Sequence, residues 1–84
     1  MREMTIASDV AGMVWKVEVS ERDLVEKDSV LIVFESMKME IPLAAPEAGK
    51  IARLLVKPGE AVQEGQNVIV LLVEWYIYNR RVYL

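Results

Sequence analysis

The sequence repeats itself at a spacing of 37 residues, and this repeat limits the folds open to the chain. Ala11 and Gly12 recur as Ala48 and Gly49. The apolar positions that follow also coincide without a gap, as Val14 with Ile51, Val17 with Leu54, Val19 with Val56, Val25 with Val62, and Ile32-Val33 with Ile69-Val70. Because one register holds throughout, we expect two structural units of similar shape.

Each unit has the composition of β structure. Valine and isoleucine predominate, and β-branched side chains suit a pleated, half-buried surface. In the second unit, Pro58-Gly59 and Glu64-Gly65 indicate turns. We therefore predict a strand over about Asn67 to Val73 and a matching strand over about Val30 to Glu35.

A helix is expected nowhere in the chain. The one candidate, Ser20 to Lys27, conflicts with the repeat because its counterpart contains Pro58-Gly59. Neither half is large enough to bury an apolar face easily by itself, but one sheet packed on another gives both a dry side. The prediction is an all-β fold, a small sandwich or flattened barrel with pseudo-twofold symmetry.

Two turn positions of the first unit lack the glycine found in the second. Arg22 stands opposite Gly59, and Asp28 stands opposite Gly65. Glycine adopts positive φ freely and Asp tolerates it better than most residues, whereas Arg tolerates it poorly. Either the turn near Arg22 differs in shape from its partner or the backbone there is strained.

The composition argues against catalysis by this chain alone. Its 84 residues suffice for one small domain and include no cysteine and no histidine. Thiolate nucleophiles, thiolate metal sites, the commonest general base and the commonest metal ligand are all missing. We expect a chain that carries, binds or is acted upon, with no catalytic residue and no metal site.

The charge and hydropathy of the chain limit the classes of partner that it could bind. The formal net charge is −3 and no basic stripe is present, so we expect no nucleic-acid partner. The longest apolar run, Val68 to Val73, is too short to span a bilayer, and the first residues do not form a signal peptide. We expect a cytoplasmic protein without a membrane partner.

The segment that joins the two units contains the candidate site. It reads ESMKMEIP from Glu35 to Pro42, between a strand ending near Phe34 and a strand running from about Glu40 to Ala45. The chain must reverse between Ser36 and Met39, so we predict a hairpin tip there. Lys38 would project from this tip into solvent.

Met37-Lys38-Met39 in this setting resembles the attachment motif of the biotinyl and lipoyl attachment domains. The resemblance covers about residues 4 to 74 and is greatest to the small single-domain biotin/lipoyl attachment proteins. It includes Ala11-Gly12, Ala45-Pro46, Gly49 and Lys57-Pro58-Gly59. The family fold is a flattened barrel of two four-stranded antiparallel sheets, with the modified lysine on a tight hairpin.

The resemblance implies a biotin carboxyl carrier. A biotin protein ligase would join biotin to the amine of Lys38, and the biotin arm would carry carboxylate between a biotin carboxylase and a carboxyltransferase. The carrier would be a monomer and would catalyse nothing itself. The acceptor of the carboxylate is not readable from the sequence.

The resemblance and the charges near Lys38 also predict roles for the residues around it. In the family the two flanking methionines, here Met37 and Met39, position the lysine for the ligase; ordinary core filling is the alternative, because Met fits irregular gaps. Ser36 stands where the family commonly has Ala. Glu35 and Glu40, if close to the lysine, would favour its charged form, which cannot attack an acyl adenylate.

Two other functions remain open. A lipoyl carrier shares the fold and the lysine position, but lipoyl domains typically have Asp-Lys-Ala at the tip, so Met-Lys-Met favours biotin over lipoate. An interaction module would leave Lys38 unmodified and bind elsewhere. We assign residues 1–74 to the attachment domain and residues 75–84 to an aromatic C-terminal tail of unassigned role.

Overall fold

The computed structural model describes residues 2–73, which form eight strands and no helix. The strands are β1 (Arg2–Ala7), β2 (Gly12–Val17), β3 (Leu24–Val25), β4 (Val30–Ser36), β5 (Met39–Ala44), β6 (Gly49–Leu54), β7 (Ala61–Val62) and β8 (Asn67–Val73). No helix in this range is long and apolar enough to cross a membrane. The predicted tail, residues 75–84, lies outside the described residues.

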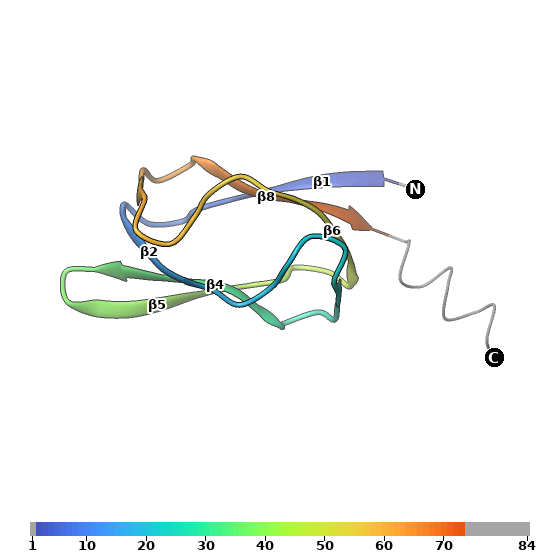
Figure 1. Ribbon diagram of the computed structural model, residues 1–84, viewed down its shortest axis with the longest axis horizontal. Coiled ribbons are helices and arrows are strands. Elements are labelled where there is room, and N and C mark those ends of the chain that lie inside the picture. The colour runs from blue at the N-terminus through green and yellow to red at the C-terminus, as the bar shows by residue number, and fades with distance from the viewer. Residues whose placement is uncertain (1, 74–84) are drawn as a thin grey trace.

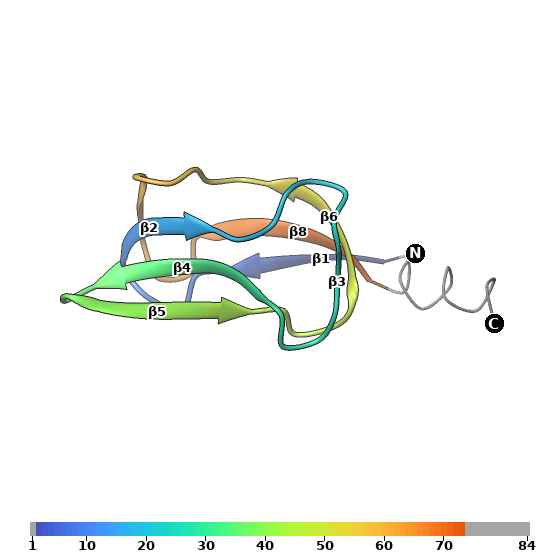
Figure 2. The ribbon, with the colours of Figure 1, turned by 60° about the horizontal axis from the view of Figure 1, so that its bottom comes forward.

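The strands form two four-stranded sheets that face each other (Figures 1 and 2). One sheet has the order β1-β8-β6-β3 and the other the order β5-β4-β2-β7. Every pairing within them is antiparallel. The predicted fold class is therefore confirmed.

A shift of 37 residues relates the two sheets along their whole length. It carries β2, β3 and β4 onto β6, β7 and β8, and it carries β1 onto β5, with identical strand lengths. The irregularity of register between Val14 and Lys16 recurs between Ile51 and Arg53. The repeat seen in the sequence is thus a pseudo-twofold relation between the sheets.

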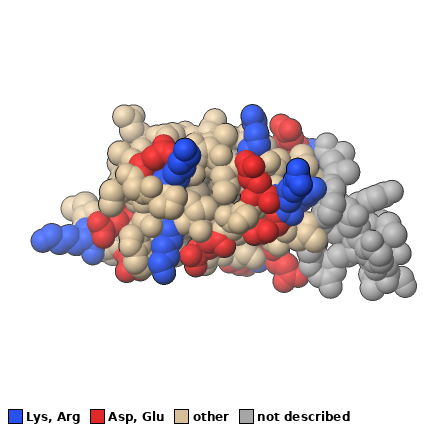
Figure 3. All heavy atoms as spheres, viewed as in Figure 1, with Lys and Arg blue, Asp and Glu red and all other residues tan. Residues whose placement is uncertain are grey.

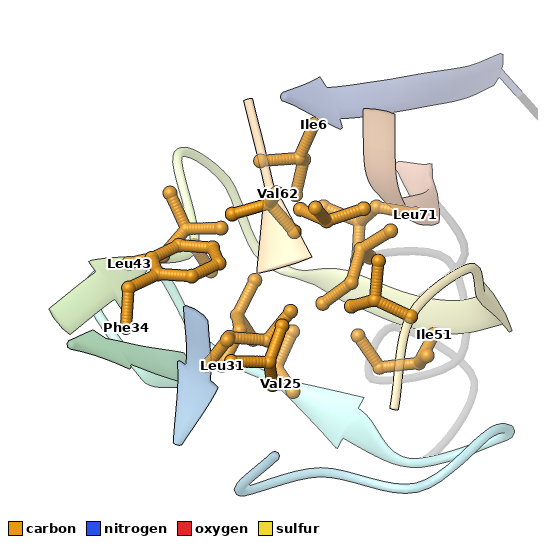
Figure 4. Packing of buried hydrophobic residues seen from close by; sticks show 14 residues of the cluster. Ile6, Val25, Leu31, Phe34, Leu43, Ile51, Val62 and Leu71 are labelled. Carbon is orange, nitrogen blue, oxygen red and sulfur yellow. The ribbon is translucent and has the colours of Figure 1, made fainter. Parts of the chain in front are cut away.

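The core lies between the two sheets and is built from positions that the shift also relates. Phe34 of β4 corresponds to Leu71 of β8, and Val14 of β2 corresponds to Ile51 of β6; all four are fully buried. Figure 4 shows the buried side chains of the two sheets pointing toward one another. Burying each such side chain stabilises the fold by roughly 1.5–3 kcal/mol.

The turn around Arg22 has the same shape as its glycine-containing partner. Arg22 has a φ of 79° and Gly59 a φ of 91°. The Arg22 N–H donates to the carbonyl of Ile51 at 2.7 Å, and the Gly59 N–H donates to the carbonyl of Val14 at 2.7 Å. Of the two alternatives left by the sequence, the structure supports backbone strain at Arg22.

The second glycine-free turn behaves in the same way, with less strain. Asp28 has a φ of 73°, close to the 85° of Gly65. The candidate helix over residues 20–27 is absent, as the repeat predicted, because this segment is occupied by these two turns and by β3.

Candidate functional site

The β4–β5 hairpin carries the candidate site at one end of the molecule (Figure 1). Glu35 pairs with Glu40 and Ser36 pairs with Met39, so the turn itself consists of Met37 and Lys38. The predicted hairpin tip is confirmed. Strand β4 ends at Ser36, one residue beyond the Glu35 predicted from the repeat, and β5 begins at Met39, one residue before the predicted Glu40.

Both turn residues have a left-handed backbone. Met37 has a φ of 53° and Lys38 a φ of 65°. Positive φ at both central residues is the requirement of a type I′ turn, in which Asn-Gly is the favoured pair. Left-handed conformations of other residues cost on the order of 1–3 kcal/mol each and concentrate at functional sites. The chain thus keeps Met and Lys where Asn and Gly would be more stable.

The side chains at the tip face solvent. Met37 is 92% exposed and Met39 is 64% exposed. Lys38 is also exposed, and it is the only Lys or Arg between Val30 and Ala44. At the hairpin end in Figure 3, basic atoms project beyond the body with acidic atoms behind them. The core-filling alternative for the two methionines is wrong.

The base of the hairpin is held against the start of β2. The Ser36 hydroxyl donates a hydrogen bond to the carbonyl of Ala11 at 2.8 Å. A Cβ placed on Gly12 would overlap the carbonyl oxygen of Glu35 and lie 3.2 Å from the Ser36 Cβ. Glycine at position 12 therefore permits the close approach that supports the hairpin.

This supporting role of Gly12 was not predicted from the sequence, although a signal for it was present. Gly49, which corresponds to Gly12, makes the same approach in the other sheet, where an added Cβ would lie 2.5 Å from the Leu72 carbonyl oxygen. The recurrence of Ala-Gly in both units was the sequence signal for this close packing.

The two glutamates lie across from each other at the base of the tip. Glu35 and Glu40 are directly opposed in the antiparallel ladder, and both are exposed. Like charges in this arrangement are mildly destabilising. Within residues 2–73, neither forms an ion pair with Lys38. The condition under which the glutamates would favour the charged amine, a close pairing with Lys38, is therefore not met in the structure.

The chemistry available to this arrangement is that of an acceptor. Lys38 offers a primary amine on a long side chain, held away from the body of the domain, without a hydrogen-bond partner in the described part of the chain. The same residues contain no group of three or more carboxylates placed to hold a metal ion.

The two-sheet fold with an exposed lysine in a two-residue hairpin turn defines a prosthetic-group attachment domain. A family model described as "Biotin-requiring enzyme" matches residues 2–71. The chain therefore belongs to the biotin/lipoyl attachment family.

Curated relatives include small proteins and large carboxylases. The chain is 40% identical over 68 residues to a biotin/lipoyl attachment protein of Bacillus subtilis. The matched region covers 81% of this chain and 93% of the relative. It is 38% identical to a biotinylated protein TB7.3 homolog of Mycobacterium leprae, with 79% and 93% covered. A putative urea carboxylase of Emericella nidulans is 36% identical, but only 6% of its length is covered.

Solved structures place the same domain within larger carboxylases. A single-chain, multi-domain long-chain acyl-CoA carboxylase matches with a TM-score of 0.80 and 29% identity, over 96% of this chain and 9% of that one. The urea carboxylase of Kluyveromyces lactis matches with a TM-score of 0.81 and 30% identity, over 86% and 6%. Together with the small relatives, these matches support a biotin carboxyl carrier role; the chain is a carrier and not a catalyst.

Proposed function

We propose that Lys38 is the residue to which biotin is covalently attached, through an amide formed by a biotin protein ligase. The observation that carries the proposal is the hairpin tip, where the lysine is exposed in a strained two-residue turn between two exposed methionines. A fold selected only for stability would favour Asn-Gly at this turn. Retaining Met37 and Lys38 indicates that their side chains are used.

The ligase would have to supply the deprotonation that acylation requires. A lysine amine is protonated near neutral pH and must be neutral to attack an acyl adenylate. No histidine exists in the chain, and Lys38 has no hydrogen-bond partner within residues 2–73 that could accept its proton. Control of the reaction would therefore rest with the ligase.

After modification, the biotin arm would carry carboxylate from a biotin carboxylase to a carboxyltransferase. The support for this step is the presence of matching domains inside carboxylases, combined with the projection of the hairpin from the body. The carrier would act as a monomer in the cytoplasm, where ATP is available for biotin ligation and for carboxylation of the biotin ring.

The test is the intact mass of the domain after incubation with a biotin protein ligase, biotin and ATP. We expect one biotin on the parent and on a Lys57→Arg control, and none on Lys38→Arg. Trypsin cleaves after unmodified lysine, so labelling at Lys38 also removes the cleavage between Lys38 and Met39. Labelling of Lys38→Arg would contradict the assigned site, and labelling by a lipoyl ligase alone would assign lipoate in place of biotin.

A further inference from the structure

The two most exposed methionines of residues 2–73 are those on either side of Lys38. Met37 is 92% exposed and Met39 is 64% exposed, whereas Met13 on β2 is 40% exposed and Met4 on β1 is half-buried. A thioether at such a position is open to attack by oxidants dissolved in the surrounding water. The methionines of residues 2–73 most open to oxidation are therefore the two sequence neighbours of Lys38.

The fold does not need these side chains to be apolar. The position that corresponds to Met39 in the other sheet is Arg2, which is charged, exposed and paired with Glu47 at 3.5 Å. A polar group is thus compatible with this place in the ladder. Converting the tip methionines into polar side chains should leave the core and both sheets intact, since neither methionine belongs to the core.

We propose that Met37 and Met39 form a modification site for peroxide, and that their oxidation lowers the capacity of Lys38 to accept biotin. A lone pair of the thioether sulfur attacks one oxygen of hydrogen peroxide and the O–O bond breaks. The sulfur gains that oxygen and loses two electrons, and the other oxygen leaves as water after proton transfer. The inference rests on the proposed function of Lys38.

The expected loss follows from the change in polarity. Methionine sulfoxide is polar and chiral where the thioether is apolar and flexible. A ligase surface that packs on the two thioethers would meet two sulfoxide oxygens without matching donors. Losing both contacts should slow labelling about tenfold, which corresponds to about 1.4 kcal/mol.

The first measurement locates the oxidation. The domain is treated with hydrogen peroxide under native conditions, quenched with free methionine and digested with trypsin. The cleavage sites divide the methionines conveniently: residues 28–38 carry Met37, residues 39–50 carry Met39, and residues 3–16 carry both Met4 and Met13. We expect sulfoxide at Met37 first, then at Met39, with Met13 and Met4 slower. Oxidation of Met13 ahead of Met37 would overturn the inference.

The second measurement compares ligase labelling rates before and after peroxide treatment. The parent should lose about tenfold, and methionine sulfoxide reductases of both stereospecificities should restore the rate. The matched control carries Met37→Leu and Met39→Leu, which keep apolar side chains but remove both sulfurs; its rate, whatever its starting value, should not respond to peroxide.

The outcomes separate the inference from the proposed function. An untreated parent that accepts no biotin contradicts the function of Lys38. A parent that accepts biotin at an unchanged rate, with sulfoxide demonstrated at both Met37 and Met39, contradicts the inference alone. An equal loss in the leucine control would also contradict it, because the effect would then arise elsewhere in the domain or in the ligase.

Discussion

The two ends of the molecule are built from corresponding strands but differ in what closes them. At one end the pair Ser36–Met39 is followed by the turn Met37-Lys38. At the other end the corresponding pair is Arg2–Val73, where β1 begins and β8 ends. Within residues 2–73, the ladder is the same at both ends, and a hairpin closes only one of them. The candidate site is therefore located where the twofold relation between the sheets is broken.

The two halves also differ in how their turns are made. Arg22 and Asp28 adopt positive φ in the first half, where Gly59 and Gly65 do so in the second, with matching hydrogen bonds. The second half follows the usual preferences of turns, and the first half does not. The shape of a turn is thus set by the packing around it, and its residue decides how much strain the shape carries.

The strongest way to test the equivalence of the two halves is to add a Cβ at each close approach. Gly12→Ala and Gly49→Ala each push a methyl group into a backbone carbonyl of a neighbouring strand. Each should lower the free energy of unfolding by about 2 kcal/mol. Urea denaturation followed by tryptophan fluorescence measures the loss.

Ligase labelling then separates the two variants. Only Gly12 lies against the base of the lysine hairpin, so Gly12→Ala should also slow labelling in conditions where both variants are folded. Equal labelling rates would mean that the contact at Gly12 supports the fold without positioning Lys38.

Replacing the tip with a favourable turn should sharpen the contrast between the two ends. The double change Met37→Asn with Lys38→Gly installs residues that suit positive φ at both positions. It should raise the free energy of unfolding by roughly 1.5 kcal/mol and abolish labelling. The control is Lys38→Arg, which abolishes labelling without a gain in stability; a double variant no more stable than this control would show that the tip is not strained.

Exchanging residues between equivalent turns tests the strain at Arg22 directly. Arg22→Gly should stabilise the domain by about 0.8 kcal/mol, and Gly59→Arg should destabilise it by a similar amount. The comparison is clean because a Cβ at Gly59 would meet no atom within 4 Å. Asp28→Gly should gain less, since Asp tolerates positive φ better than Arg does. Thermal unfolding of the three variants measures these differences. A melting temperature that is lowest for Arg22→Gly and highest for Gly59→Arg would disprove strain at Arg22.

The smallest expected effect concerns the hydrogen bond that is particular to the hairpin half. Ser36→Ala removes the donor to the Ala11 carbonyl, and the corresponding residue in the other sheet, Val73, cannot donate. Because the bond is exposed, its loss should cost only about 0.5 kcal/mol. Hydrogen exchange of the backbone amides at the hairpin base should detect the loosening; unchanged protection there would show that Gly12 alone holds the two segments together.

The sequence predicted the central strands of both sheets and missed one correspondence. Apolar residues at matching places revealed the relation of β2, β3 and β4 to β6, β7 and β8. The relation of β1 to β5 was not recognised, because these edge strands bury few side chains and so constrain few positions. The agreement of Glu3 with Glu40, Ile6 with Leu43, and Ala7 with Ala44 is the weak trace that remains.

The site was predictable in its place but not in its conformation. The hairpin and the exposed lysine followed from a polar segment between two apolar strands. The left-handed backbone of Met37 and Lys38 did not follow, since neither residue favours it. The preference for exposed methionines over core filling followed from their place at the tip and not from composition, because methionine is ordinarily buried.

The adjacency of Arg2 and Val73 has a consequence for how such a domain can arise. If a free 37-residue unit associated with a second copy around a twofold axis, chain termini would lie at both ends of the molecule. Fusing the copies into one gene product covers one pole with a connecting segment and leaves the other with the ends of the strands. Within residues 2–73, Met37 and Lys38 of the connecting segment are the residues that have no counterpart under the 37-residue shift, so they are free of the packing that the corresponding positions of the two halves share.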